Sequence, residues 1–238
     1  MSSLLVGVLD EVDRTIARQV ERIAHDSPVD RSLLDVGCWD GAHTERYARL
    51  LGGKARGVEI FETQAREAEA RGIDVARLDL ESGTFPWADE STDIVVSNQV
   101  FEHLKNVWRP MSEIYRVLRT GGWLILSVPN LGSLHNRVLL ALGRQPTSIR
   151  TLGPHVRGYT HGEIRRFIAH GGAFRIEHTF GVGFYPFPIP VATAFARLWP
   201  GASHTTVVVA RKVRVLPQSP WATWYRSERE TGLQSSFE

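Results

Sequence analysis

The spacing of apolar residues changes near Ser32. Before it, apolar side chains recur every three or four positions, at Val12, Ile16, Val20 and Ile23. This period puts them on one face of a helix, so we expect an amphipathic helix over residues 10–26. Ser27-Pro28 is a suitable end for it. We assign residues 1–30 to an N-terminal region that contains this helix, and we expect the helix to pack on the domain that follows.

From Ser32 onward, short apolar runs alternate with segments of helical period. The runs predict strands at residues 32–36, 55–60, 73–78, 93–97 and 123–128, and the segments between them predict helices ending near residues 51, 70 and 118. Alternating strands and helices indicate right-handed βαβ units, hence a mostly parallel sheet. The strands are apolar almost throughout, as expected for a sheet with helices on both faces.

After Pro129 the alternation becomes less regular. We expect a helix at 131–142, an irregular stretch at 143–159, a helix at 160–169, and two late strands at 174–180 and 205–210. Thr160 followed three residues later by Glu163 is a capping-box pattern. We therefore place one α/β domain at residues 31–212 and a C-terminal tail at 213–238.

Composition narrows the function classes. The 238 residues carry 28 Lys and Arg against 26 Asp and Glu, with no basic run, so we expect no nucleic-acid partner. The single cysteine, Cys38, excludes an intramolecular disulfide and fits a cytoplasmic protein. No stretch approaches the ~20 apolar residues needed to span a bilayer, so we expect no transmembrane segment.

The turn at residues 35–41 is the first candidate ligand site. Gly37 and Gly41 let the chain turn sharply after a strand and let a ligand approach the backbone, and the next helix starts with free N–H groups. In open parallel sheets, ligands bind at the carboxyl ends of the strands. This turn alone would suit a dinucleotide or another nucleotide equally well.

Acidic residues at the next two strand ends narrow the choice. Glu59 ends the second predicted strand, where a carboxylate can accept hydrogen bonds from ribose hydroxyls. Asp79 ends the third strand and can accept a hydrogen bond from an adenine amino group, with Leu80 offering apolar contact. Together the strand ends predict a cofactor that contains adenosine.

The stretch 33–130 resembles class I S-adenosylmethionine (SAM)-dependent methyltransferases, namely the type 11 and type 12 methyltransferase-domain families. The resemblance rests on ordered motifs: Asp35-x-Gly37-Cys38-x-x-Gly41, Gly57-Val58-Glu59, Leu78-Asp79, Phe101-Glu102-His103-Leu104 and Leu118-Arg119-Thr120-Gly121-Gly122. It implies a Rossmann-like, seven-stranded, mostly parallel sheet with an antiparallel last strand, and SAM as cofactor. The implied cofactor-binding residues are Asp35, Gly37, Cys38, Trp39, Gly41, Glu59, Ile60, Asp79, Leu80 and Asn98.

Trp39 is the one departure within the first motif, because it replaces the family's middle glycine. A bulky side chain fits there only if it points away from the cofactor or stacks on it. Cys38 beside it is expected to be a small buried packing residue, since a thiol among apolar neighbours is inert.

Gln99-x-x-Glu102-His103 bears on metal binding and catalysis. Some relatives carry Glu-x-x-Glu-His here and bind a divalent cation, but Gln99 removes one anionic ligand, so we expect no metal. Glu102 would instead help to cap the next helix. His103 is a candidate general base or a structural imidazole.

The irregular stretch at 143–159 resembles the substrate region of the methionine-biosynthesis methyltransferase-like group, which makes His155 and Tyr159 candidates for contacting the acceptor or for anchoring a loop. Residues 184–199 are rich in aromatic residues and proline, which suits a lid, or a surface that contacts a partner or, peripherally, a membrane.

We therefore expect methyl transfer to an oxygen or nitrogen of a small molecule, a sugar or a lipid-linked glycan. The alternatives are a non-catalytic SAM-binding partner of another enzyme and an RNA methyltransferase.

Overall fold

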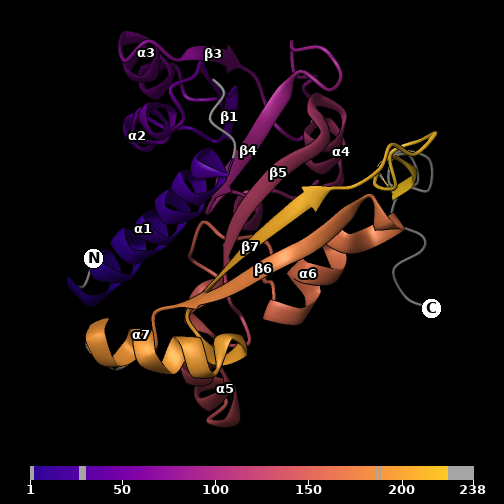
Figure 1. Ribbon diagram of the computed structural model, residues 1–238. Coiled ribbons are helices and arrows are strands. Elements are labelled where there is room, and N and C mark those ends of the chain that lie inside the picture. Colours follow the sequence, from indigo (N-terminus) through magenta and orange to yellow (C-terminus); the bar gives the residue numbers. More distant parts are fainter. Residues whose placement is uncertain (1–2, 27–30, 186, 188, 225–238) are drawn as a thin grey trace.

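A computed structural model describes residues 3–26, 31–185, 187 and 189–224 (Figure 1). Within these residues, seven strands form one sheet in the order β3-β2-β1-β4-β5-β7-β6. The strands are β1 (Leu33–Val36), β2 (Ala55–Glu59), β3 (Asp74–Arg77), β4 (Thr92–Asn98), β5 (Leu118–Pro129), β6 (Phe174–Val182) and β7 (Thr205–Lys212). β1 to β5 pair in parallel and β7 runs antiparallel to both of its neighbours, which confirms the predicted topology.

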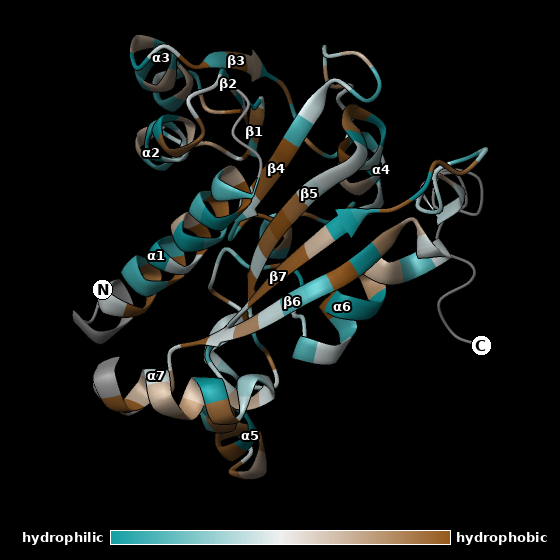
Figure 2. Cartoon of the chain, in the orientation of Figure 1, coloured by the Kyte–Doolittle hydropathy of each residue, from teal (hydrophilic) through white to brown (hydrophobic). Residues whose placement is uncertain are grey.

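Helices cover both faces of the sheet. They are α1 (Ser3–His25), α2 (Ala42–Leu51), α3 (Glu62–Ala70), α4 (Trp108–Val117), α5 (Leu134–Ala141), α6 (His161–Ala169) and α7 (Ile189–Leu198). Successive strand residues point to opposite faces, so Leu33 packs with α1 and α2 while Leu34 packs with α4 and α6. Figure 2 shows hydrophobic colour along much of the central strands and also on α5 and α7, and hydrophilic colour on parts of α1 and α6.

α1 extends the predicted helix toward the N-terminus, so the apolar run at residues 4–9 belongs to it. A buried carboxylate ties it to α2. Asp13 of α1 accepts hydrogen bonds from the Tyr47 hydroxyl at 2.5 Å and from His43 Nδ1 at 2.8 Å, and it pairs with Arg46.

The segment at 184–199 contains a helix that the sequence analysis does not predict. α7 begins at Ile189 and has Pro190 in its first turn. A proline is tolerated at that point because the first N–H groups of a helix have no intrahelical partner.

The chain beyond β7 folds back onto the domain. Trp221 is fully buried, and its Nε1 donates a hydrogen bond to the Phe167 carbonyl at 3.0 Å. In the described part of the chain, none of the helices has the length and apolar character that crossing a bilayer requires.

Candidate active site

Three residues with positive φ shape the turn between β1 and α2, namely Gly37 (82°), Trp39 (49°) and Gly41 (77°). A Cβ at Gly37 would come within 2.5 Å of the Val100 side chain, and one at Gly41 within 2.4 Å of Ile73. Both positions therefore require glycine for two reasons, the left-handed backbone and the lack of space for a Cβ.

Glu59 organises this turn from the end of β2. Its buried carboxylate accepts hydrogen bonds from the backbone N–H groups of Trp39 (3.0 Å), Ile60 (2.8 Å) and Phe61 (2.9 Å). Only one of these, from Trp39, goes to Oε2. A carboxylate oxygen can accept two hydrogen bonds, so Oε2 keeps capacity for a ligand hydroxyl. The donor set thus fits a ribose-bearing cofactor.

Trp39 keeps the left-handed backbone of a glycine while turning its side chain outward. The side chain is 54% exposed and packs edge-on against Phe61, with ring centroids 5.8 Å apart. Ile60 is also exposed. The departure from the family motif therefore changes the rim of the turn and leaves its backbone path open.

Asp35 and Cys38 face the interior of the domain. Asp35 accepts a hydrogen bond from the Thr44 hydroxyl at 2.6 Å, which fastens α2 to β1, and burial raises the pKa of Asp35 to about 7. Cys38 packs with Ala68 and Ile73, and burial raises the pKa of its thiol far above the ordinary value. Cys38 is therefore a packing residue, as its sequence context predicted.

The remaining predicted cofactor residues lie along the same carboxyl edge of the sheet. Asp79 follows β3 and is exposed; its carboxylate accepts hydrogen bonds from the Glu81 N–H at 2.9 Å and from the Ser82 hydroxyl at 3.3 Å. Leu80 beside it is half-buried. Asn98 ends β4 and accepts a hydrogen bond from the Ser127 hydroxyl at 2.6 Å.

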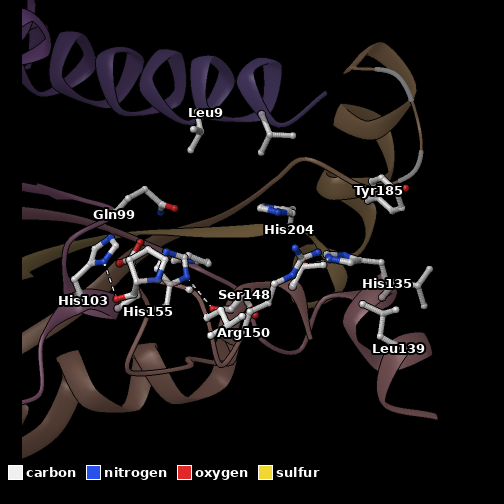
Figure 3. Close-up of a pocket in the computed structure, with 18 of the residues that line it drawn as sticks. Leu9, Gln99, His103, His135, Leu139, Ser148, Arg150, His155, Tyr185 and His204 are labelled. Atoms are coloured by element: carbon white, nitrogen blue, oxygen red, sulfur yellow. Dashed lines mark hydrogen bonds between the residues drawn. The ribbon is translucent and has the colours of Figure 1, made fainter. Parts of the chain in front are cut away.

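A cavity of about 1120 Å³ lies beyond the ends of β4 and β5 (Figure 3). The β1–α2 turn is not part of its lining. Gln99 lines the cavity and follows Asn98, one of the predicted cofactor residues, directly in the chain. The cavity and the predicted cofactor site are therefore neighbours at this point. Gln99 has a φ of 57° and its side-chain Nε2 donates a hydrogen bond to the Ser127 hydroxyl. A strained backbone held by such contacts is typical of functional sites.

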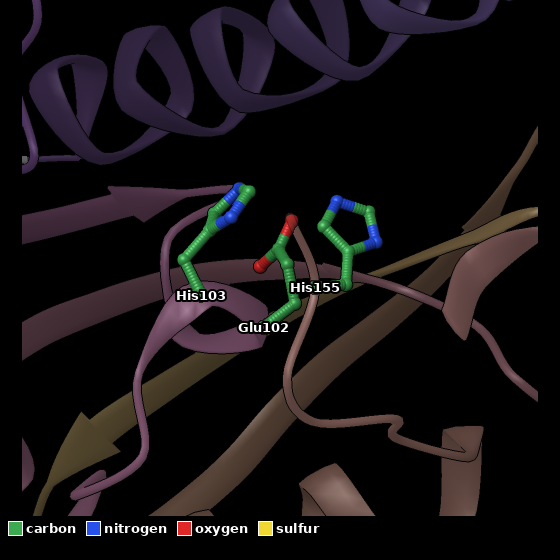
Figure 4. Close-up of side chains that lie close together, drawn as sticks. All are labelled: Glu102, His103 and His155. Atoms are coloured by element: carbon green, nitrogen blue, oxygen red, sulfur yellow. The ribbon is translucent and has the colours of Figure 1, made fainter. Parts of the chain in front are cut away.

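Glu102, His103 and His155 meet at the inner end of this cavity (Figure 4). The two imidazole rings lie 4.8 Å apart, and the three side chains offer ligand-type atoms all within 4.8 Å of one another, enough to hold a metal ion. Glu102 Oε2 is buried without a hydrogen-bond partner, and burial raises the pKa of this carboxyl to about 8. The expectation that Glu102 caps the next helix is wrong, since α4 has no side-chain cap.

The hydrogen bonds of the two histidines define their tautomers. Nδ1 of His155 lies 2.8 Å from the Ser148 carbonyl, and Nδ1 of His103 lies 3.3 Å from the Pro154 carbonyl. A carbonyl only accepts, so each Nδ1 carries a proton and each Nε2 is free to accept one. Burial lowers the pKa of His103.

Tyr159 is not among the residues that line the cavity. Its buried hydroxyl donates a hydrogen bond to the Phe101 carbonyl at 3.2 Å, and burial raises its pKa well above the ordinary value. This geometry anchors the loop that carries His155.

Sequence reasoning missed two further histidines of the cavity. His135 of α5 and His204, which precedes β7, stack with ring centroids 5.6 Å apart. Burial lowers the pKa of His204 to about 4. Both residues lie far apart in the sequence and in no motif, so nothing in the sequence signals their meeting.

The strand order, the turn and the acidic strand ends define a Rossmann-like domain of the class I methyltransferase type. A methyltransferase-domain family model matches residues 34–126. A probable S-adenosylmethionine-dependent methyltransferase of Mycolicibacterium smegmatis is 31% identical over 68% of this chain and 58% of its own length. An uncharacterised methyltransferase of Mycobacterium leprae is 31% identical over 84% of this chain and 67% of its own length.

The chain belongs to this methyltransferase-domain family, and its cofactor is SAM. The chain spans about three fifths to two thirds of the length of these relatives. The structure of a SAM-dependent methyltransferase from Archaeoglobus fulgidus superposes with a TM-score of 0.57 at 17% identity, covering 84% of this chain and 94% of that one. This likeness concerns the fold alone. The resemblance of residues 143–159 to the methionine-biosynthesis group stays a prediction.

Proposed function

We propose that this protein transfers the methyl group of SAM to a hydroxyl or amine of a small molecule, a sugar or a lipid-linked glycan bound in the cavity. The observation that carries the proposal is the cluster of Glu102, His103 and His155 at the inner end of that cavity, beside Gln99 at the carboxyl edge. Two imidazoles with free Nε2 atoms on either side of a buried carboxyl group suit proton removal from an acceptor.

The cofactor residues have distinct proposed roles. The backbone of the turn from Asp35 through Gly37, Cys38, Trp39 and Gly41 borders the methionine part of SAM. In the nucleoside part, Glu59 accepts the ribose hydroxyls and Asp79 accepts the adenine amino group, while Ile60, Leu80 and Asn98 border the adenine.

SAM supplies an electrophilic methyl group on a sulfonium ion. The chain's task is to align the acceptor and exclude water, which the partly enclosed cavity favours. His155 Nε2 accepts the acceptor's proton, because the bond from Nδ1 to the Ser148 carbonyl fixes the required tautomer. The ionised form of Glu102, which its pKa of about 8 makes predominant only above that pH, lies close enough to stabilise the imidazolium that results.

The proposal is tested with SAM and a panel of hydroxylated and amino acceptors, by measuring S-adenosylhomocysteine. Turnover with at least one acceptor is expected. Tight SAM binding by calorimetry without turnover on any acceptor would instead indicate a non-catalytic regulator. Turnover restricted to RNA would indicate the third alternative.

The role of His155 has its own test. His155→Ala should lower kcat about 10²-fold or more, as loss of a general base does, while the Kd for SAM stays unchanged. Val156→Ala, a change in the exposed neighbouring residue, is the matched control. An unchanged kcat would refute the role. Loss of wild-type activity on chelation, restored by a divalent cation, would show that the cluster holds a metal instead.

A further inference from the structure

The outer end of the cavity opens beside an exposed apolar surface, which we call the α5–α7 surface. It consists of Val138, Leu142, Tyr185, Phe195, Leu198 and Trp199, all exposed. Leu198 is 83% exposed. In Figure 1 the two helices lie together at one end of the molecule, and Arg137 of α5 lies over the Trp199 ring at 5.8 Å. Large exposed apolar patches mark interaction sites.

The two ends of the cavity differ in composition. Figure 3 shows Gln99, His103 and His155 at one end, and Tyr185 and Leu139 beside His135 at the other. Tyr185 and Val138 line the cavity and also belong to the α5–α7 surface. The volume of about 1120 Å³ exceeds the usual range for small-molecule pockets, about 300–1,000 Å³. The cavity therefore runs from the proposed reaction centre to this surface.

Charge distinguishes this end of the molecule from the rest. Residues 131–162 and 178–212 contain no Asp or Glu, although the whole chain has nearly equal numbers of acidic and basic residues. Four exposed arginines lie on the two helices and the loop after α5, namely Arg137, Arg144, Arg150 and Arg197, while Arg157 of the same loop is half-buried. None of the four forms an ion pair with a described residue. Exposed apolar side chains that include a tryptophan and a tyrosine, together with arginines that lack acidic partners, are characteristic of interfacial membrane binding.

We propose that the α5–α7 surface docks on an anionic lipid bilayer. The apolar side chains enter the interface while the arginines contact the anionic head groups. If the cavity is the acceptor site of the proposed function, docking turns its outer end toward the bilayer and makes a membrane lipid the acceptor class. The docking itself is independent of catalysis and is measured separately.

The test is co-sedimentation of the full chain with vesicles of phosphatidylglycerol and phosphatidylcholine, compared with vesicles of phosphatidylcholine alone. We expect binding to the anionic vesicles that weakens at high salt. Leu198→Asp should weaken binding about tenfold or more, because it removes one buried leucine side chain from the interface. Val215→Asp, at an exposed apolar position in the segment after β7, is the matched control and should bind like wild type.

A second measurement places the contact. Tryptophan emission should shift to the blue on anionic vesicles, and Trp199→Phe should reduce the shift while the protein still sediments. Unchanged SAM affinity of Leu198→Asp shows that the variant is folded. This measurement tests the cofactor site independently of vesicle binding.

Three results would overturn the proposal. One is equal binding of wild type and Leu198→Asp to anionic vesicles, or no binding at all. Another is binding to an RNA oligonucleotide without binding to vesicles. The third is a dimer in sedimentation velocity that Leu198→Asp dissociates, which would assign the surface to a second copy of the chain.

Discussion

In the β1–α2 turn, the backbone conformation and the side-chain direction are determined separately. Gly37 and Gly41 are fixed by their left-handed backbone and by neighbours that leave no room for a Cβ. Trp39 adopts the same left-handed backbone at a cost of roughly 1–2 kcal/mol. Its outward side chain shows that a motif position can lose its glycine without blocking the turn.

Two substitutions in and beside this turn should therefore have opposite effects on SAM affinity. Glu59→Ala should abolish SAM binding, because it removes the proposed ribose acceptor and the partner of three backbone N–H groups. Trp39→Gly, its matched control, should keep the Kd for SAM within about threefold, less than 1 kcal/mol, because the backbone path is preserved. Calorimetry measures both. Unchanged affinity of Glu59→Ala would refute the proposed cofactor pose.

Glu102 predicts a pH dependence of stability. Its folded-state pKa of about 8 lies above its ordinary value of 4.5. Its favourable contribution is therefore complete below pH 4.5 and is lost as the pH rises through 8. Relative to wild type, Glu102→Gln should gain roughly 1–4 kcal/mol in free energy of unfolding between pH 5 and pH 9, the order of magnitude for a shift of this size. Denaturant unfolding at both pH values measures this, and parallel curves would contradict it.

At the scale of elements, the junction of α1 and α2 depends on Asp13. Burial alone would raise the pKa of Asp13, but hydrogen bonds from His43 and Tyr47 outweigh it and lower the pKa. The hydrogen bond to Asp13 raises the pKa of His43 against the effect of burial. α1 also packs on β7, so this contact fixes the helix that supplies Val8 and Leu9 to the cavity.

Asp13→Ala should lower the free energy of unfolding by about 1–3 kcal/mol, because it leaves the buried Tyr47 hydroxyl without its acceptor. The loss should be largest between pH 3.8 and 6.5, the ordinary pKa values of the two groups. Below that window Asp13 becomes protonated as the pH falls through its lowered pKa, and above it His43 loses its proton as the pH rises through its raised pKa. Thermal unfolding across pH measures the effect. Asp10→Ala, on an exposed residue of the same helix, should show no such window.

At the scale of the whole molecule, the last described segment completes the core under β6. Trp221 packs against Tyr115, Phe167 and Phe174, with ring centroids 5.8 to 6.3 Å apart. These partners come from α4, α6 and β6, so one side chain joins three elements. The tail predicted at 213–238 therefore contributes to the core at least as far as Trp221.

Trp221→Ala should lower the free energy of unfolding by about 3–5 kcal/mol, as expected for emptying a fully buried aromatic site. Val215→Ala, at an exposed position in the same segment, should change it by less than about 0.5 kcal/mol. Denaturant unfolding measures both. Equal stability of the two variants would show that the segment packs only loosely.

The sequence by itself determined the sheet, its helices on both faces, and the edge of the sheet that carries the proposed cofactor residues. These features follow from short-range patterns, because the period of apolar residues defines each element and parallel strands bring their carboxyl ends to one edge. Glu59, Asp79 and Asn98 could thus be placed together before any contact was known. The bounds of α1 and the presence of α7 could not be predicted from the sequence. Tertiary packing decides how far a helix extends and whether a proline is tolerated at its start.

Only the tertiary structure decided the cavity. His155 joins Glu102 and His103, and His204 meets His135, from chain segments whose separation follows no period. Tyr159, predicted beside His155, instead turns its hydroxyl to a backbone carbonyl. The sequence likewise left two possible directions for the Trp39 side chain, away from the cofactor or stacked on it. The physical reason is common to all: side-chain direction and long-range contact depend on which surfaces pack together, and local residue spacing does not encode that.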